Sequence, residues 1–347
     1  MKRIVLVSIV MALFLLSLIP ITGCFRSKTP LGLDDEIRVA ADSTIWIQAE
    51  PILRAIFEKV ENTPQPEKVF KLINEEPNKV KRFKNVIFLS TLDAKDKFST
   101  VINSGLTEQA RAKVEQGTII FVKKDEWVKN QVVLFLIGND LPTLLSKIDE
   151  MRAEIFFQFD DYWNQFHKNI LYRDREQADV ENHLLKNYGW MIRVPIDFRL
   201  ATQSAKDRFV MFHRPVPFRW LSIFWIEATD PTVITKEWCI AKRNEIGKLF
   251  FENEVVEEVY EPVIAEDVIF LNRRALKLKG LWKDDIKVAG GPFRMYCFFD
   301  QPTERIYFID MHVFAPNFQR GKLHYFRQME IIANTFRTNL EANAKTK

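Results

Sequence analysis

Beyond residue 35, apolar residues follow two spacings along the chain, one typical of helices and one typical of strands. Apolar residues three or four positions apart predict helices over 45–60, 93–116, 144–172, 176–188, 230–251 and 320–337. Alternating or continuous apolar runs predict strands over 36–41, 69–73 and 85–90. The run 85–90 is apolar at nearly every position, which is typical of a strand buried on both faces.

One arrangement occurs three times: two strands joined by a short turn and followed by a helix. The strand pairs are 118–123 with 131–137, 209–213 with 220–228, and 293–299 with 305–315. A lone hairpin is marginal in water, and a following helix can cover its apolar face. Further strands are predicted over 263–271 and 275–281. The pattern therefore predicts an α+β protein with mostly antiparallel sheets, helices packed on one face, recurring hairpin–helix units and two halves of similar size.

The division between the two halves is predicted at residues 173–176. This stretch is polar and charged, and it interrupts the apolar periodicity of the helices on either side. We therefore expect a first α+β half over 35–173 and a second over 174–340. Gly189 follows the second of these helices directly and is well placed to end it in a left-handed conformation.

The first 24 residues have a different character. Lys2 and Arg3 are followed by an apolar run over 4–19 that only two serines interrupt. The run is shorter than the ~20 apolar residues that a spanning helix needs. A basic start, an apolar middle and small residues at the end are typical of a secretory signal peptide. The alternative is an uncleaved N-terminal helix that ends near Pro20.

The segment Ile21-Thr22-Gly23-Cys24 resembles the lipobox of bacterial lipoproteins. The resemblance implies that residues 1–24 are a lipoprotein signal peptide and that Cys24 becomes the mature N-terminus and carries acyl chains. Two or more such chains anchor a protein stably. Residues 25–34 would then be a short tether. We expect the body to be held at a bacterial membrane in the cell envelope, facing the periplasm, with the outer membrane as one location.

The charge balance of the chain limits the kinds of partner to be expected. The chain has 50 Lys+Arg and 46 Asp+Glu, and removal of the signal peptide leaves 48 against 46. This near-balance argues against a nucleic-acid partner, which usually needs a concentrated basic patch. The expected partners are the membrane, through the lipid on Cys24, and a protein of the envelope.

The remaining Cys239 and Cys297 have apolar neighbours, which favours two buried thiols over a disulfide.

The third hairpin carries the best local candidate for catalysis. If Asp300 pairs with Arg305, then Asp310, His312 and Cys297 all point to one face of the sheet. A carboxylate that orients an imidazole near a thiol is an arrangement used in nucleophilic catalysis. The alternative is a buried Asp–His hydrogen bond that satisfies two polar groups within an apolar layer.

Histidines further along the chain raise the question of a metal site. His324 lies twelve residues after His312, and with Asp310 the two histidines make a candidate ligand set. Scattered ligands without close spacing are the competing interpretation, and no cofactor is expected. His167 shares one edge of its predicted helix with Asp160, and a solvated helix edge is the favoured interpretation there.

The second turn carries a candidate for ligand binding. Arg214, Arg219 and Trp220 bracket it, and arginine beside an aromatic ring can hold an acidic or glycan ligand by charge and stacking. The favoured alternative is a basic hairpin tip in solvent.

Well-known catalytic motifs are missing from the sequence. It contains no G-x-x-x-x-G-K-[ST], no H-E-x-x-H and no G-x-S-x-G. We therefore expect a membrane-anchored envelope lipoprotein with a non-enzymatic binding or structural role. The alternative is an envelope hydrolase or transferase with a site around Asp310 and His312.

Short motifs in a fixed order over some 300 residues resemble an uncharacterised family of bacterial envelope lipoproteins, the domain of unknown function numbered 4837. The resemblance implies a Gram-negative origin and export, and it brings no activity and no catalytic residues. The motifs that carry it are the lipobox, Asp42-Ser43 with Trp46, Pro64-Gln65-Pro66, Tyr188-Gly189-Trp190 with Val194-Pro195, Gly280-Leu281-Trp282, Gly290-Gly291-Pro292-Phe293, Ala315-Pro316 and Arg327-Gln328-Met329-Glu330.

Overall fold

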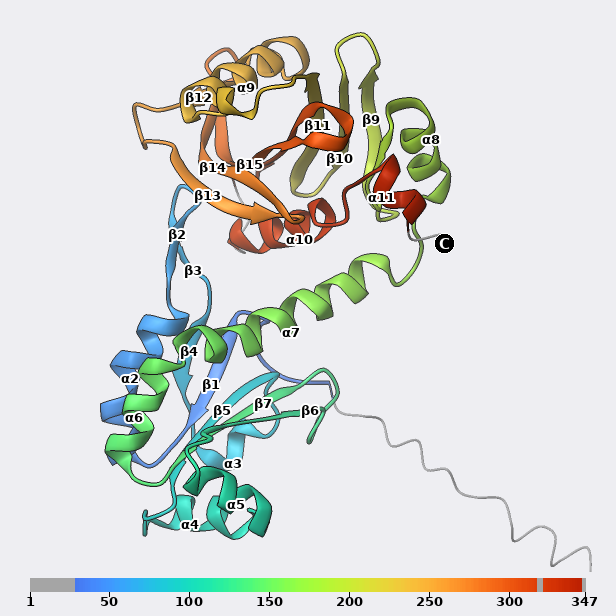
Figure 1. The fold of residues 1–347 in the computed structure, drawn as a ribbon. Coiled ribbons are helices and arrows are strands. Elements are labelled where there is room, and N and C mark those ends of the chain that lie inside the picture. Colours follow the sequence, from blue (N-terminus) through green and yellow to red (C-terminus); the bar gives the residue numbers. More distant parts are fainter. Residues whose placement is uncertain (1–28, 317–320, 345–347) are drawn as a thin grey trace, which may run out of the picture.

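The computed structural model describes residues 29–316 and 321–344. The expected signal peptide, its lipidation site Cys24 and the first residues of the expected tether lie outside these described residues. Within them, no helix combines the length and the apolar character needed to cross a membrane. Two sheets stand apart in the molecule and are joined by helix α7 and by a two-stranded ribbon (Figure 1).

The first sheet has five strands in the order β4-β1-β5-β7-β6. All neighbouring strands are parallel except the pair β6–β7. Strand β5 is buried at every position, as its apolar run predicted. Helices lie in the connections from β1 to β4, from β4 to β5 and from β5 to β6, and crossovers of this type allow parallel pairing, whereas β6 and β7 are joined by a turn. The bounds are β1 Glu36–Ala40, β4 Lys71–Asn74, β5 Asn85–Thr91, β6 Ile120–Lys124 and β7 Val132–Gly138.

Helices cover both faces of this sheet, whereas a single helical face was expected. One apolar cluster packs α2, α6 and α7 against one face of the sheet. A second cluster packs α3 and α4 against the opposite face. Parallel sheets are usually covered on both faces in this way. The predicted helix 144–172 is divided at Met151 into α6 and α7. The bounds are α2 Ser43–Phe57, α3 Pro77–Val80, α4 Lys97–Ser104, α5 Glu108–Glu115, α6 Leu141–Glu150 and α7 Arg152–Tyr172.

The second sheet has eight strands, ordered β12-β14-β15-β16-β11-β10-β9, with β13 also paired to β14. All of its pairs are antiparallel, as predicted. The third hairpin has the predicted register, with Asp300 opposite Arg305. The bounds are β9 Arg199–Ser204, β10 Phe209–Arg214, β11 Phe218–Glu227, β12 Val255–Glu257, β13 Ile264–Phe270, β14 Arg273–Asp284, β15 Ala289–Asp300 and β16 Arg305–Phe314.

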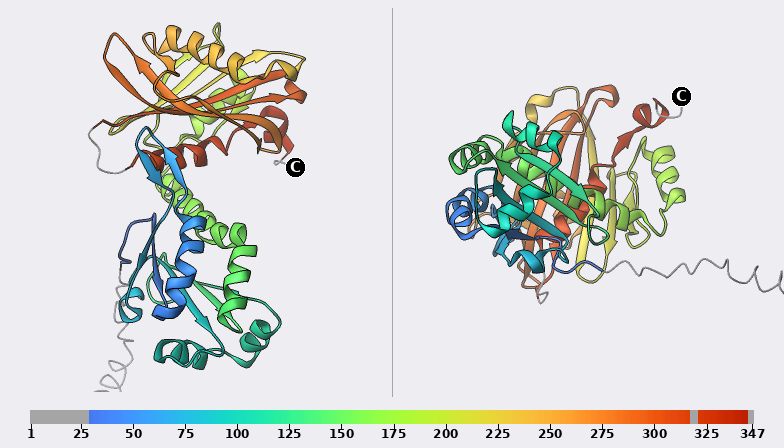
Figure 2. Two further views of the ribbon diagram at one scale, coloured as in Figure 1. Left: turned by 90° about the vertical axis from the view of Figure 1, so that its left-hand side faces the viewer. Right: turned by 90° about the horizontal axis from the view of Figure 1, so that it is seen from below.

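Helices lie on opposite faces of the second sheet (Figure 2). Helix α9 (Lys236–Phe250) packs on one face, and α10 (Leu323–Ala333) packs on the other. Helix α8 (Ala178–Tyr188) ends at Gly189, whose φ of 77° is the predicted left-handed cap. The α+β class is therefore confirmed. The remaining elements are β8 Trp190–Met191, paired with β17 Arg337–Thr338, the short helix α11 Asn339–Ala344, and the single turns Pro231–Val233 and Gln301–Thr303.

The ribbon β2–β3 (Val60–Asn62 and Pro66–Lys68) reaches from the first sheet to the second (Figure 1). At its far end the Glu67 carboxylate accepts hydrogen bonds from the backbone N–H groups of Lys322 and Leu323, at 2.7 and 3.0 Å. These N–H groups belong to the unsatisfied first turn of α10, so a residue 255 positions away caps that helix. Helix α7 packs against α10 as well, and one apolar cluster runs through both sheets.

Candidate functional site

Asp310 and His312 lie on β16 beneath α9, in the company of two charged residues that the sequence analysis did not identify. Arg243 of α9 donates to Glu254, with Nη2 2.6 Å from Oε1, and to Asp310, with Nε 3.1 Å from Oδ1. His312 Nδ1 lies 3.4 Å from Asp310 Oδ2. All four side chains are at most 5 % exposed. Nothing local in the sequence indicates that Arg243 and Glu254 face this hairpin.

This four-residue cluster is closed to substrates. Burial by itself raises the pKa of Asp310, but the positive charge of Arg243 and the contact with His312 outweigh it and lower the pKa below its usual value. The carboxylate is therefore held ionised by an arginine. A catalytic role would need an open approach to Asp310 and His312, and their side chains are 2 % and 1 % exposed. The arrangement is closer to the alternative of a buried polar network inside an apolar layer, although Arg243 Nη1 and His312 Nδ1 make no hydrogen bond within it.

Cys297 faces α9 in the same layer and is fully buried, as is Cys239. Both are free thiols, as the sequence favoured. Burial, together with the neighbouring Cys239, raises the pKa of Cys297 well above its usual value. A thiol of this kind is a poor nucleophile, because the thiolate is the reactive form.

The second turn does not bring Arg214, Arg219 and Trp220 together. Arg214 pairs with Asp197 at 2.6 Å near the surface. Arg219 is 2 % exposed, and its Nη1 donates to Gln328 Oε1 at 3.0 Å on the α10 side of the sheet. Burial lowers the pKa of Arg219 to about 10.

Trp220 points to the opposite face of the sheet and stacks on His312, with ring centroids 4.7 Å apart. Successive strand residues alternate between faces, so Arg219 and Trp220 cannot share one ligand on this strand.

His324 is separated from Asp310 and His312 by the second sheet, so the three do not form one ligand set. The pair lies under α9, whereas His324 begins α10 on the other face. His324 instead lies near His167 and Asp34. His167 is 3 % exposed, so its helix edge is not solvated as expected.

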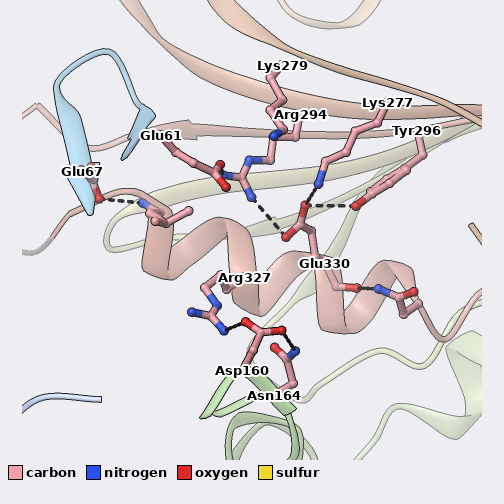
Figure 3. Close-up of polar contacts among 12 residues, drawn as sticks. Glu61, Glu67, Asp160, Asn164, Lys277, Lys279, Arg294, Tyr296, Arg327 and Glu330 are labelled. Carbon is pink, nitrogen blue, oxygen red and sulfur yellow. Dashed lines mark hydrogen bonds and ion pairs between the residues drawn. The ribbon is translucent and has the colours of Figure 1, made fainter. Parts of the chain in front are cut away.

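A network of charged residues fills the junction where the ribbon meets α10 and the second sheet (Figure 3). We call Glu61, Lys277, Arg294, Tyr296 and Glu330 the junction cluster. Glu330 Oε1 accepts from Lys277 Nζ at 2.7 Å and from the Tyr296 hydroxyl at 3.1 Å, and its Oε2 accepts from Arg294 Nη1 at 3.1 Å. Arg294 also pairs with Glu61 of the ribbon. The cluster thus links three segments that are distant in sequence.

The junction cluster is electrostatically satisfied. Burial alone raises the pKa of Glu330, but the charges of Arg294 and Lys277 outweigh it and lower the pKa to about 2. Burial and the Glu330 charge raise the pKa of Tyr296, so this hydroxyl stays protonated. Beside the cluster, Arg327 of α10 pairs with Asp160 of α7 (Figure 3). A cavity of about 320 Å³ opens here. Asp160 and Arg327 of its lining pair with each other, and Glu330 pairs with Lys277 and Arg294. The arrangement joins the two halves of the molecule.

A larger and more apolar cavity, about 680 Å³ in volume, lies in the first half between α4, α5 and the sheet. We call it the α4–α5 cavity. Phe88 of β5 and Phe135 of β7 stack with centroids 5.1 Å apart. Phe98 of α4 and Trp127 each approach Phe88 to 5.9 Å. Ile102, Leu106, Ala110, Phe121 and Ile137 complete most of the apolar lining.

Three lysines also line the α4–α5 cavity: Lys81, Lys97 and Lys123. Lys81 Nζ lies 5.5 Å from the centre of the Trp127 ring. Lys123 pairs with the exposed Glu126 at 2.9 Å. No acidic side chain lines the cavity among the described residues. The sequence did not predict this cavity, although the continuous apolar run at β5 indicated that both faces of this strand are covered.

Comparison with protein families adds one match. Residues 177–335 match the domain of unknown function DUF4837. The DUF4837 match covers the whole second sheet together with α8, α9 and α10. This part of the chain is thus related to an uncharacterised domain family. No curated protein matches the chain.

Solved structures give partial likenesses. A crystal structure from Bacteroides thetaiotaomicron VPI-5482 matches at 10 % identity and a TM-score of 0.28, over 44 % of this chain and 46 % of that one. The Saccharomyces cerevisiae Ran-binding protein Mog1p matches at 10 % identity and 0.31, over 44 % and 90 %. LpqN, involved in cell envelope biogenesis of Mycobacterium tuberculosis, matches at 11 % identity and 0.27, over 42 % and 81 %. The chain therefore spans about half the length of the Bacteroides protein, and no function is transferred from these structures.

Proposed function

We propose that this protein is an envelope lipoprotein that binds an anionic amphiphile, an acyl chain with an acidic head group, in the α4–α5 cavity. The observation that carries the binding role is an apolar cavity of about 680 Å³ that three lysines help to line. Its volume falls within the range of ligand sites, which is ~300–1,000 Å³. Lipid modification of Cys24 would hold the body at a bacterial membrane, close to a source of such molecules.

The chemistry of the lining matches both parts of this ligand. Each methylene that leaves water for an apolar site contributes ~0.8 kcal/mol. Lys81, Lys97 and Lys123 supply positive charge for a carboxylate or phosphate and oppose a cationic head group. Val101 is 65 % exposed at the wall formed by α4, which places apolar surface where a chain would enter. A non-enzymatic role is consistent with the closed Asp310–His312 cluster.

The binding role is tested by photocrosslinking in bacterial membranes that contain the full chain. The probes are three acyl chains of equal length that carry a photoreactive group, with a carboxylate, a phosphate or a trimethylammonium head. We expect the two anionic probes to label peptides within 77–137, and their ratio distinguishes the two head groups. Equal labelling by the cationic probe, or labelling spread over the whole chain, would overturn the proposal.

Two kinds of variant sharpen this test. Ala110→Trp fills the cavity and should reduce labelling at least tenfold, whereas Ala112→Trp on the exposed side of the same helix should not. Replacing the three rim lysines together by glutamine should weaken anionic labelling without loss of the fold. Lys113→Gln, outside the lining, is its matched control. Labelling that survives both cavity variants contradicts the assigned site.

The anchor is tested separately through Cys24→Ser. We expect this variant to keep its signal peptide, to lose the acyl mass and to change its membrane fractionation. A product that fractionates and weighs the same as the wild type, apart from the one-atom substitution, would overturn the lipoprotein assignment while leaving the cavity test untouched.

A further inference from the structure

Three possible metal ligands meet at the junction of the two halves. They are Asp34, just before β1, His167 near the end of α7, and His324 in the first turn of α10. One ligand atom from each residue lies within 4.8 Å of the other two. His167 Nε2 is 2.9 Å from Asp34 Oδ2. Positions separated by 133 and 157 residues in the chain thus converge on one point.

The surroundings fix the orientation of these side chains. The His167 ring stacks on Trp163 at 3.8 Å and meets the edge of Phe166 at 5.3 Å. Its centroid is 5.1 Å from that of His324. These ring contacts restrict the orientations that the His167 imidazole can adopt.

Two outer side chains complete the surroundings. The Gln328 amide lies 3.0 Å from His324 Nε2, and Gln328 is itself held by Arg219. Lys84 pairs with the other oxygen of Asp34. The imidazoles and the carboxylate therefore keep a narrow range of positions without further rearrangement of the helices.

We propose that Asp34, His167 and His324 bind a divalent transition metal, with Zn²⁺ as the representative ion. Two imidazoles and one carboxylate suit zinc and its neighbours, whereas Mg²⁺ and Ca²⁺ prefer sites made of oxygen ligands only. Three protein ligands leave a fourth position for water. The site is independent of the α4–α5 cavity, because it lies between α7 and α10.

The bound ion would fasten the N-terminal segment to both halves. Asp34 precedes the first strand, His167 belongs to the helix that leaves the first sheet, and His324 belongs to the helix under the second. An ion that binds only the folded arrangement stabilises it by mass action. Zn²⁺ should therefore raise the melting temperature of the whole chain, and a chelator should lower it.

The test uses the full chain purified in detergent micelles and freed of metal with a chelator. Zn²⁺ is titrated against a chromophoric competitor, retained metal is measured by mass spectrometry, and Mg²⁺ serves as the comparison ion. We expect one equivalent of Zn²⁺, a higher melting temperature with Zn²⁺, and no effect of Mg²⁺. A chain that retains no Zn²⁺, or whose melting temperature Zn²⁺ leaves unchanged, overturns the site.

Variants connect the binding to these residues. His324→Gln and His167→Gln should each weaken Zn²⁺ binding at least tenfold, and His324 is the partly exposed member whose replacement the fold tolerates better. His183→Gln is the matched control, because His183 is an exposed helical histidine held by Gln203 at 2.9 Å. Unchanged affinity in His324→Gln, or an equal loss in His183→Gln, refutes the assignment. Co²⁺ in place of Zn²⁺ reports the ligand geometry through its visible absorption.

Discussion

The junction cluster predicts a large and pH-dependent loss of stability when Glu330 is replaced by glutamine. The substitution removes the carboxylate that faces Lys277 at 2.7 Å and Arg294 at 3.1 Å. Breaking a buried pair by removing one partner typically costs ~3–5 kcal/mol, because the remaining charge is left uncompensated. The Lys277 and Arg294 side chains are only 15 % and 5 % exposed, so water compensates these cations poorly.

The pKa of Glu330 gives an independent magnitude. It falls from 4.5 to about 2 on folding, which corresponds to ~3 kcal/mol of stability at neutral pH. Because the folded-state pKa is the lower one, this contribution is complete above the unfolded value and is lost as the pH falls toward the folded value. At pH ~3 the protein should have lost ~2 kcal/mol of it.

The assay is urea unfolding followed by tryptophan fluorescence at pH 7 and pH 3. The difference in unfolding free energy between wild type and Glu330→Gln should shrink by ~2 kcal/mol between the two pH values. Subtracting the variant removes the contributions of all other carboxylates. Glu154→Gln, an exposed position on α7, should follow the wild type at both pH values. A difference that is below ~1 kcal/mol at pH 7, or that does not change with pH, would refute the reasoning.

Three further predictions concern α9 and the layer beneath it. Arg243→Met should destabilise the fold by ~3–5 kcal/mol in urea unfolding, because two buried carboxylates lose their counter-ion; a loss below ~1 kcal/mol would contradict this role. Gly247→Ala should also destabilise the fold, since a Cβ there would lie 2.0 Å from the Glu254 carbonyl oxygen. Helix propensity alone predicts a gain in stability of ~1 kcal/mol. A lower melting temperature of the variant therefore supports the close contact, and a higher one contradicts it. Cys239 and Cys297 should resist a thiol reagent at pH 8 until urea unfolds the chain, and rapid reaction of the native protein would show that this layer opens.

The third hairpin shows how far the sequence could lead. Its apolar alternation and short turn determine the register, so the pairing of Asp300 with Arg305 and the common face of Asp310 and His312 could be predicted. The residues that surround Asp310 and His312 could not be predicted. Arg243 lies on a helix and precedes Asp310 by 67 residues in the chain. The apolar pattern of a strand does not indicate which helix will pack over it.

The first sheet shows a different limit. The periodicity located its strands, and the run at β5 indicated burial on both faces. The periodicity does not contain the direction in which two strands pair, because side chains alternate in both arrangements. Parallel β1–β5 pairing depends on the path of the chain through α2 and the ribbon. The same limit applies to His324, whose neighbours His167 and Asp34 come together only when α7 packs against α10.

The ribbon β2–β3 has a mechanical consequence if the body is tethered through Cys24 as proposed. If α7 were the sole connection between the sheets, the two halves could swing about it as about a hinge. Glu67 holds the start of α10, and Glu61 holds Arg294, so a second attachment resists that rotation. A force on the N-terminal segment would act on the folded body first at the Leu31–Phe83 bridge. Because two attachments connect the sheets, the two halves would then move together as one rigid unit.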